Sequence, residues 1–266
     1  MNKTKIDWCD MTWNPVTGCL HGCEYCYARK IANRFGCASE THYNDCVGEE
    51  CQWITEGTGK IHELHEPVYD VDRGHNAPYP FEFDPTFHRY RLSEPQKTKT
   101  PQRIFVCSMA DLFGDWVPDE WIQQVFEACE KSPRHKYLVL TKNPKRYRQL
   151  AYIPPINLWL GATVGQDKDK DRETINEMAY LSDNFLSAEP LHYDISNIID
   201  YDNIDWVILG QETGNRKDKI TPKDSWIKFT VDACRYYNIP IFIKEPLFQR
   251  FPIQEYPMGL ERCDEN

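Results

Sequence analysis

Residues 205–244, DWVILGQETGNRKDKITPKDSWIKFTVDACRYYNIPIFIK, contain the pattern that decides the fold. Two short apolar runs, 205–212 and 240–244, have the length and composition of buried strands. Between them we expect a helix, where Thr221 can cap the first turn and Asp224 completes a box-like pattern. The expected apolar residues of this helix are Trp226, Phe229 and Ala233. Strand, helix and strand in this order predict a right-handed unit with two parallel strands.

The same alternation extends back to about residue 103. Four more apolar runs predict strands, at 103–109, 137–142, 158–164 and 184–189. Apolar stripes predict the helices between them, one formed by Trp121, Ile122, Val125, Phe126 and Cys129 and another by Ile175, Met178 and Ala179. Nearly continuous apolar runs are typical of parallel strands covered on both faces. The predicted fold class is therefore α/β, with a parallel sheet closed into a full or partial barrel.

Composition narrows the class of protein. The chain has 266 residues, and 41 acidic against 31 basic side chains give a net charge of −10. This length suits one domain over 1–266, and the acidic excess disfavours a broad basic face for nucleic acid, although it allows a local basic groove. No stretch is long and apolar enough to span a bilayer, so we expect a cytoplasmic protein with no membrane partner. In that compartment eleven cysteines favour metal binding over disulfides.

Residues 37–101 break the strand and helix rhythm. The segment holds six of the eighteen prolines and shows no sustained period. We expect a long irregular insertion after the first helix that lies over one end of the sheet. Three cysteines and three of its histidines, Cys37, Cys46, Cys51, His62, His65 and His75, allow a second metal site, but the cysteine spacings match no compact ligand motif. We therefore favour a metal-free cap that shapes the substrate pocket.

The most informative residues are the cysteines of the run Cys19-Leu20-His21-Gly22-Cys23-Glu24-Tyr25-Cys26, which has the spacing C-x3-C-x2-C. A loop with this spacing can place three thiolates around three corners of a cubane cluster and leave the fourth iron open to a chelating small molecule. Structural zinc is an alternative, although zinc sites usually pair two C-x2-C units. Three buried unliganded thiols are a weaker alternative, because buried free cysteines usually occur singly in apolar elements.

This run resembles the signature of the radical S-adenosylmethionine (radical SAM) superfamily, including the aromatic Tyr25 before the last cysteine. More narrowly, the chain resembles the phage gene-product thirty-seven/sixty-eight family of radical-SAM-like proteins. The segments that carry this resemblance are 7–8, 12–19, 108–113, 140–142, 159–161, 185–191 and 205–208. The resemblance implies a partial (β/α) barrel and a [4Fe-4S] cluster on Cys19, Cys23 and Cys26 that chelates SAM. It also implies an external one-electron reductant of the flavodoxin or ferredoxin type.

Polar residues at the strand ends are the candidates for SAM binding, because ligands of parallel barrels lie at the carboxyl ends of the strands. We expect Lys142 to contact the SAM carboxylate and Thr163 or Glu189 to contact the ribose. The family's usual Gly-Gly-Glu motif is absent after the second strand, where Asp111 is the proposed substitute. The full candidate set is Tyr25, Ser108, Asp111, Thr141, Lys142, Thr163, Ser187, Glu189 and Glu212. Solvation or helix capping is the alternative role for each strand-end residue.

Two functions from different classes remain open. The first is a radical SAM enzyme that cleaves SAM to a 5′-deoxyadenosyl radical, with a nucleotide or nucleic acid as one candidate substrate. Local basic clusters at Lys97, Lys99 and Arg103 and at Lys142, Lys145, Arg146 and Arg148 fit that substrate, although such clusters are usually solvated faces. The second is a non-enzymatic iron–sulfur or zinc protein, either an electron carrier or a partner-binding module. An electron carrier would need a fourth cysteine for its cluster, and none follows Cys26 at ferredoxin-like spacing.

Overall fold

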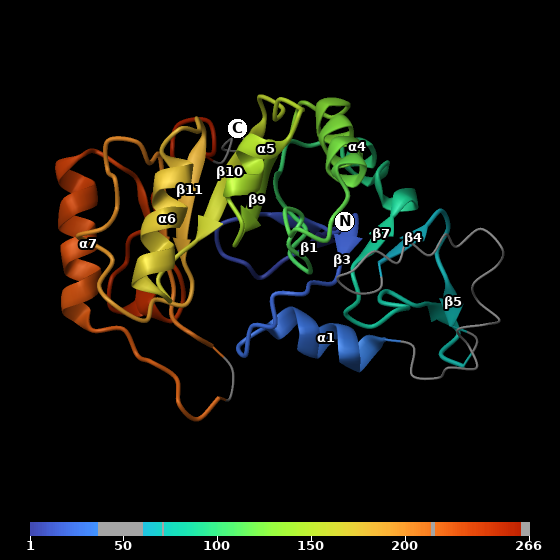
Figure 1. Ribbon diagram of the computed structural model, residues 1–266, viewed down its shortest axis with the longest axis horizontal. Coiled ribbons are helices and arrows are strands. Elements are labelled where there is room, and N and C mark those ends of the chain that lie inside the picture. Colours follow the sequence, from blue (N-terminus) through green and yellow to red (C-terminus); the bar gives the residue numbers. More distant parts are fainter. Residues whose placement is uncertain (37–60, 71, 214–215, 262–266) are drawn as a thin grey trace.

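A large, mostly parallel sheet forms the centre of the molecule in the computed structural model, which describes residues 1–36, 61–70, 72–213 and 216–261 (Figure 1). Its strand order is β1-β2-β8-β9-β10-β11-β12-β13, and every neighbouring pair is parallel except β1 with β2. The strands are β1 (Asn2–Lys3), β2 (Met11–Trp13), β8 (Arg103–Val106), β9 (Lys136–Thr141), β10 (Leu158–Thr163), β11 (Asn184–Ala188), β12 (Val207–Leu209) and β13 (Ile241–Ile243). The six strands expected from the apolar runs are therefore confirmed, with ends that differ by up to three residues.

The two faces of the sheet are buried in different ways. Alternate strand residues such as Ile104 and Val139 pack with the inner sides of four helices, α4 (Asp119–Glu130), α5 (Lys145–Gln149), α6 (Lys168–Met178) and α7 (Asp224–Tyr236). The residues between them, such as Phe105 and Phe185, point to the other face and form a second core with Trp8 and Leu260. Among the described residues this second core contains no helical side chain. One face of the sheet is thus covered by helices, and the other face is filled largely by its own aromatic residues.

Helix α7 differs from the sequence expectation in its start and in its buried face. It begins at Asp224 after Lys223, with no side-chain cap, so Thr221 lies outside the helix. Its buried residues are Ile227, Thr230, Val231 and Cys234, whereas Phe229 is 54% exposed. Two apolar stripes lie one position apart on this helix, and packing against the sheet selects the stripe with Ile227. The expected faces of α4 and α6 are correct, since Trp121, Phe126, Ile175 and Met178 are buried.

The described part of the 37–101 segment is more regular than expected. Strands β4 (His62–Leu64) and β7 (Thr86–His88) form a small sheet with β3 (Val16–Thr17), while β5 (Tyr69–Asp70) pairs with β6 (His75–Asn76). A 3-10 helix (Arg89–Arg91) and α3 (Glu94–Lys97) follow. Strands of two or three residues are too short to give a periodic signal, which explains why they escaped prediction. Cys37, Cys46 and Cys51 lie outside the described residues.

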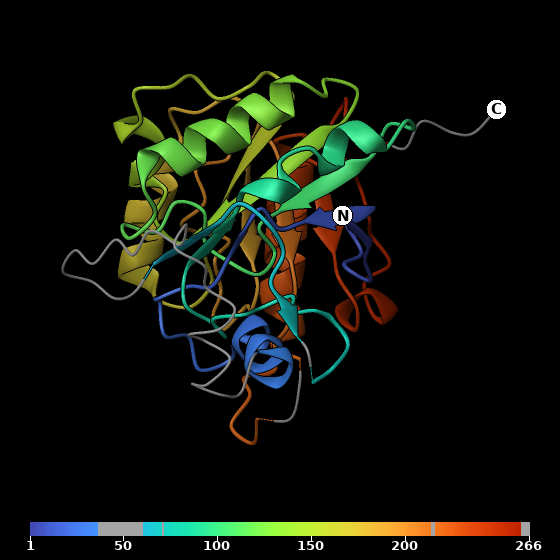
Figure 2. The ribbon, with the colours of Figure 1, turned by 90° about the vertical axis from the view of Figure 1, so that its right-hand side faces the viewer.

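The small sheet fixes the start of the cysteine loop. His88 is fully buried. Its Nε2 forms a hydrogen bond with Thr17 Oγ1 at 2.9 Å, and its Nδ1 forms one with the Tyr90 hydroxyl at 3.1 Å. Helix α1 (Tyr27–Phe35) follows the loop and lies below the sheet, on the side away from α4, in both views (Figures 1 and 2). Across the described ranges, no helix has the length and apolar content needed to cross a bilayer.

Segments from both ends of the chain lie over the face of the sheet that carries the second core. The C-terminal segment crosses from β13 toward β2 and β8, where the Tyr256 hydroxyl donates to Asp7 O at 3.3 Å and the Arg103 guanidinium lies 4.2 Å from the Tyr256 ring centroid. The Trp206 indole N–H donates to Glu255 O at 3.0 Å. Arg103 in turn forms an ion pair with Asp10 at 2.7 Å. The two edges of the open sheet are therefore connected by side chains.

Candidate functional site

A cavity of about 240 Å³ lies at the carboxyl ends of the parallel strands and holds most of the expected site residues. All three cysteines of the loop line it, together with Tyr25, Ser108, Asp111, Thr141, Lys142, Thr163 and Glu189. Apolar walls come from Ile6, Trp8, Phe83, Phe105 and Leu140. The fold therefore brings the cysteine loop and the polar strand ends to one place. Phe83 belongs to the expected cap, so part of that segment also reaches the cavity.

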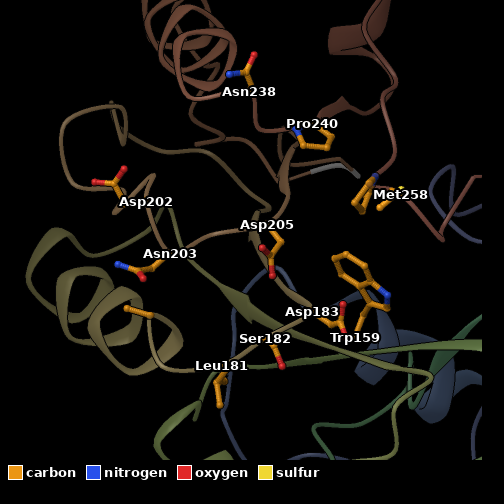
Figure 3. A pocket seen from close by; sticks show the side chains of 12 residues that line it. Trp159, Leu181, Ser182, Asp183, Asp202, Asn203, Asp205, Asn238, Pro240 and Met258 are labelled. Atoms are coloured by element: carbon orange, nitrogen blue, oxygen red, sulfur yellow. The ribbon is translucent and has the colours of Figure 1, made fainter.

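A second hollow lies at the opposite ends of the strands (Figure 3). It is lined by residues that precede or begin strands, among them Trp159, Asp183, Asp205 and Pro240. None of the site residues expected from the sequence lines it. The carboxyl-end cavity is therefore the candidate site, in agreement with the usual location of ligands in parallel α/β folds.

Close approach of two chain segments shapes the cysteine loop. Gly18 has a φ of +84°, and a Cβ at this position would lie 2.2 Å from Asp84 O, so only glycine fits. The Cys19 N–H donates to Phe83 O at 3.2 Å. At the other end of the loop, Cys26 caps α1, where its Sγ accepts from the Arg29 N–H at 3.3 Å. The Arg29 guanidinium also donates to Cys19 O at 3.3 Å, which ties the first cysteine to the helix that follows the last.

The donor set of this loop suits an iron–sulfur cluster. Burial raises the pKa of the Cys19 thiol to about 12, so the metal-free thiol is protonated and a metal that bound there would displace this proton. In the described part of the chain, no group of three or more His, Cys, Asp or Glu side chains is arranged around a single ion. A cubane cluster distributes its thiolates over separate irons, so its ligands do not have to converge on one point. Three thiols at one end of one cavity fit that requirement.

Asp111 is saturated with hydrogen bonds inside the protein. Its Oδ1 accepts from the Thr141 hydroxyl at 2.7 Å and from the Phe113 N–H at 3.0 Å. Its Oδ2 accepts from the Lys142 N–H at 2.9 Å and lies 2.7 Å from His21 Nε2. A carboxylate offers about four acceptor positions, and all four are used here. Asp111 thus joins the cysteine loop, through His21, to the end of β9, and its expected contact with SAM stays a prediction.

Lys142 is held in the cavity wall by two partners. Its ammonium donates to the Tyr25 hydroxyl and to Gln166 Oε1, the latter at 2.9 Å, and the Tyr25 hydroxyl also donates to Gln166 Oε1. Burial raises the pKa of Tyr25 above its usual range, so the phenol stays protonated. Gln166 is fixed in turn by Asp171, which accepts from the Gln166 N–H at 3.0 Å. The sequence analysis missed Gln166, because it follows the end of β10 by three residues and belongs to no recognised motif.

Glu189 and Lys244 form a charged pair on another part of the cavity wall. Glu189 Oε2 accepts from the Lys244 ammonium, and Glu189 Oε1 accepts from the Ser187 hydroxyl at 3.0 Å. Ser187 does not line the cavity and acts here as a support for Glu189. Lys244 also escaped the sequence analysis, although its position directly after β13 follows the same strand-end rule.

Glu212 lies outside the cavity, contrary to expectation. Arg216 donates to both of its carboxylate oxygens at 2.8 Å, and these hydrogen bonds lower the pKa of Glu212. Arg216 also forms an ion pair with Glu24 of the cysteine loop at 3.3 Å.

Ser108 lines the cavity, but its hydroxyl donates to Asn14 Oδ1 at 3.2 Å. Trp8 lines the cavity as well, whereas Trp13 is a core residue.

Comparisons with known proteins identify a family and a shared fold. The profile of the family "Protein of unknown function (DUF5131)" matches residues 3–247. The expected phage gene-product family finds no support in these comparisons. No curated protein matches the chain.

Among solved structures, a spore photoproduct lyase double mutant with bound AdoMet and dinucleoside spore photoproduct is similar, with a TM-score of 0.50 and 10% identity. The match covers 94% of this chain and 76% of that one. A single mutant of spore photoproduct lyase gives a TM-score of 0.52 at 11% identity and covers 91% and 79% of the two chains. At such low identity the similarity establishes the fold alone.

Proposed function

Because the chain belongs to the DUF5131 family, whose description names no activity, we propose a function from the site: a radical SAM enzyme that acts on a nucleotide-related substrate. One observation carries this proposal. The three cysteines of the C-x3-C-x2-C loop line the same cavity as the strand-end residues Thr141, Lys142 and Thr163. A cluster site and a polar ligand site are thus adjacent at the end of a parallel sheet, which we take to be a partial barrel.

In this proposal Cys19, Cys23 and Cys26 hold a [4Fe-4S] cluster, and SAM lies beside it in the cavity. When bound and reduced by an external flavodoxin- or ferredoxin-type protein, the cluster supplies the electron that cleaves SAM to methionine and a 5′-deoxyadenosyl radical. The protein contributes by positioning SAM and by keeping water away from the radical. The apolar walls formed by Trp8, Phe105 and Leu140 suit the second task.

Lys142 is the residue that we assign to the SAM carboxylate. An ammonium has three donors, of which Tyr25 and Gln166 use two, so one N–H remains for a carboxylate oxygen. Tyr25 lies between the second and third cysteines, so the same contact sets the distance between Lys142 and the cluster loop. Thr163 lines the cavity one strand further along the sheet and is assigned to the ribose hydroxyls.

The substrate class has two lines of support. The fold is shared with spore photoproduct lyase, of which one solved structure holds AdoMet together with dinucleoside spore photoproduct. The net charge of −10 disfavours a long polyanion bound over a wide face. The first observation favours a nucleotide-related substrate, and the second favours one held within the cavity over a long nucleic acid bound across a wide face.

The test is anaerobic reconstitution with iron and sulfide, followed by reduction in the presence of SAM. We expect about four irons per chain, an EPR signal that changes when SAM is added, and 5′-deoxyadenosine as a product. Cys23→Ala should lose the cluster and the product, because two neighbouring thiolates do not hold a cubane. Cys234→Ala, which removes a buried thiol of α7, is the matched control and should keep both. Stoichiometric zinc without charge-transfer absorption in the wild-type protein would contradict the proposal.

A further inference from the structure

The Glu189–Lys244 pair keeps free hydrogen-bonding capacity toward the cavity. Glu189 uses one acceptor position of each oxygen, for Ser187 and for Lys244. A carboxylate has about four such positions and an ammonium has three donors, so both groups can bind a ligand without breaking their own contact. Each side chain is 22% exposed. The pair therefore presents an acceptor and a donor side by side to a molecule in the cavity.

The surrounding backbone makes room for this arrangement. A Cβ at Gly210 would lie 3.0 Å from Glu189 Cγ, so the absence of a side chain at 210 leaves room for Glu189, whereas Lys244 Cδ, at 3.5 Å, would be at ordinary contact distance. Lys244 follows β13 and Glu189 follows β11, on strands that flank β12. The cysteine loop, in contrast, contacts the ends of β8 and β9 through His21 and Tyr25. The charged pair thus comes from other strand ends than those that contact the cysteine loop, and its Glu189 lies near Tyr27, the residue after Cys26.

Flat apolar side chains lie in the same cavity. The rings of Trp8 and Phe105 pack against each other with centroids 4.7 Å apart and an interplanar angle of 53°, and both residues line the cavity with Ile6 and Leu140. Such walls favour a planar ring, and the polar group among these four side chains is the Trp8 indole N–H, which is buried without a hydrogen-bond partner among the described residues. The charge of Lys244 is balanced by Glu189, which further disfavours an anionic group at this position.

We propose that Glu189 and Lys244 recognise the lactam edge of a nucleobase, an N–H beside a C=O, as present in thymine, uracil and guanine. The Glu189 carboxylate accepts the ring N–H, and the Lys244 ammonium donates to the carbonyl oxygen. This inference rests on the proposed function and specifies its substrate. It assigns to Glu189 a contact with substrate in place of the expected contact with the SAM ribose. The apolar walls favour a planar ring over the amide of a peptide.

The experiment measures nucleoside binding to the reconstituted protein with SAM present. Thymidine should bind at least about tenfold more tightly than N3-methylthymidine, which lacks the ring N–H, because a site built to bond a donor rejects the analogue without it. Lys244→Met should weaken thymidine binding by a similar factor. Lys228→Met, on the exposed side of α7, is the matched control and should bind like the wild type.

The outcomes of these binding measurements decide whether the pair recognises a nucleobase. Equal binding of thymidine and N3-methylthymidine by the wild-type protein would overturn it, and this comparison does not depend on any variant folding. Binding of N-acetylglycinamide as tight as that of thymidine would favour a peptide and also overturn it. Iron content and SAM cleavage are measured on the same sample. If the protein holds its cluster and cleaves SAM but shows no preference for thymidine, the inference fails while the proposed function stands.

Discussion

Asp111 shows how one side chain can hold several segments of a site together. It is 5% exposed and joins His21 of the cysteine loop to Thr141 and Lys142 at the end of β9. A charge buried this deeply is stable only because four donors surround it. The position of the cysteine loop therefore depends on a residue 85 positions beyond Cys26 in the sequence.

Asp111→Asn should destabilise the protein by about 2 to 3 kcal/mol, because the amide nitrogen would face a donor and leave it unpaired. Urea unfolding of the two proteins measures this difference. Asp202→Asn, at an exposed position in the second hollow (Figure 3), is the control and should change stability by less than about 0.5 kcal/mol. We also expect the Asp111 variant to take up less iron. Full stability together with full iron content would disprove the positioning role.

Short elements in this protein depend on single buried contacts. Strands β3 and β7 share only two residue pairs, and the His88 ring links them further through Thr17. Burial lowers the pKa of His88 well below its usual value, with Arg91 as the second cause. The folded protein keeps this ring neutral at a pH where the unfolded chain, with a histidine pKa of about 6.5, already binds a proton.

The contribution of His88 to stability should therefore be complete above about pH 6.5 and decrease as the pH falls toward the pKa of the folded state, by up to about 1.4 kcal/mol per pH unit. Urea unfolding at pH 7, 6 and 5 tests this. In His88→Gln the loss of stability between pH 7 and pH 5 should be smaller than in the wild type. His65→Gln, whose side chain is 56% exposed, should follow the wild-type pH dependence. If the free energy of unfolding changed with pH identically in the wild type and in His88→Gln, His88 would not be the source of this pH dependence.

Strand β10 has a close packing contact at Gly161. A Cβ there would lie 2.2 Å from Phe185 Cζ, so the aromatic ring of β11 occupies the space above this glycine. Gly161→Ala should cost about 1 to 3 kcal/mol through overpacking of the second core, which contains Phe185. Phe185→Leu in the same chain removes the clash, so the double variant should be more stable than the sum of the two single changes implies. Additive unfolding free energies would show that the ring and the glycine are not coupled.

At the scale of the whole molecule, the ends of the chain hold the open sheet together. Tyr256 packs against Trp206 and Phe242, with ring centroids 5.6 Å and 5.3 Å away, and also contacts Asp7 and Arg103. The N-terminal segment that it contacts carries Trp8, which lines the cavity. Stability of the sheet and shape of the site are therefore linked through this residue.

Tyr256→Ala should lower the free energy of unfolding by roughly 3 kcal/mol, since it removes a large ring that packs against the second core. Tyr256→Phe keeps the ring but removes the hydroxyl, which bonds both Asp7 O and Arg103, and should cost about 1 to 2 kcal/mol. Hydrogen exchange should become faster in β12 and β13 of the Ala variant, while α4 remains protected. Uniform exchange across the sheet would show that the C-terminal segment does not hold this edge.

The sequence by itself predicted the α/β class with a mostly parallel sheet, and it singled out the cysteine loop as the candidate site. Apolar runs of strand length and the C-x3-C-x2-C spacing are local patterns, and local patterns are visible without knowledge of distant residues. The six predicted strands are present, and the three cysteines lie in one cavity at the ends of parallel strands. The strand-end rule also placed Thr141, Lys142 and Thr163 correctly at that cavity.

Only the tertiary structure decided which polar residues share the cavity and what each one contacts. Lys142 meets Tyr25 across 117 positions of sequence, and Glu189 meets Lys244 across 55. Asp111 is occupied by internal donors, and Glu212 is turned toward Arg216, although both follow strands as the rule requires. Packing also chose the buried face of α7 from two apolar stripes. Such choices depend on the summed energy of distant contacts, and no local pattern in the sequence encodes that sum.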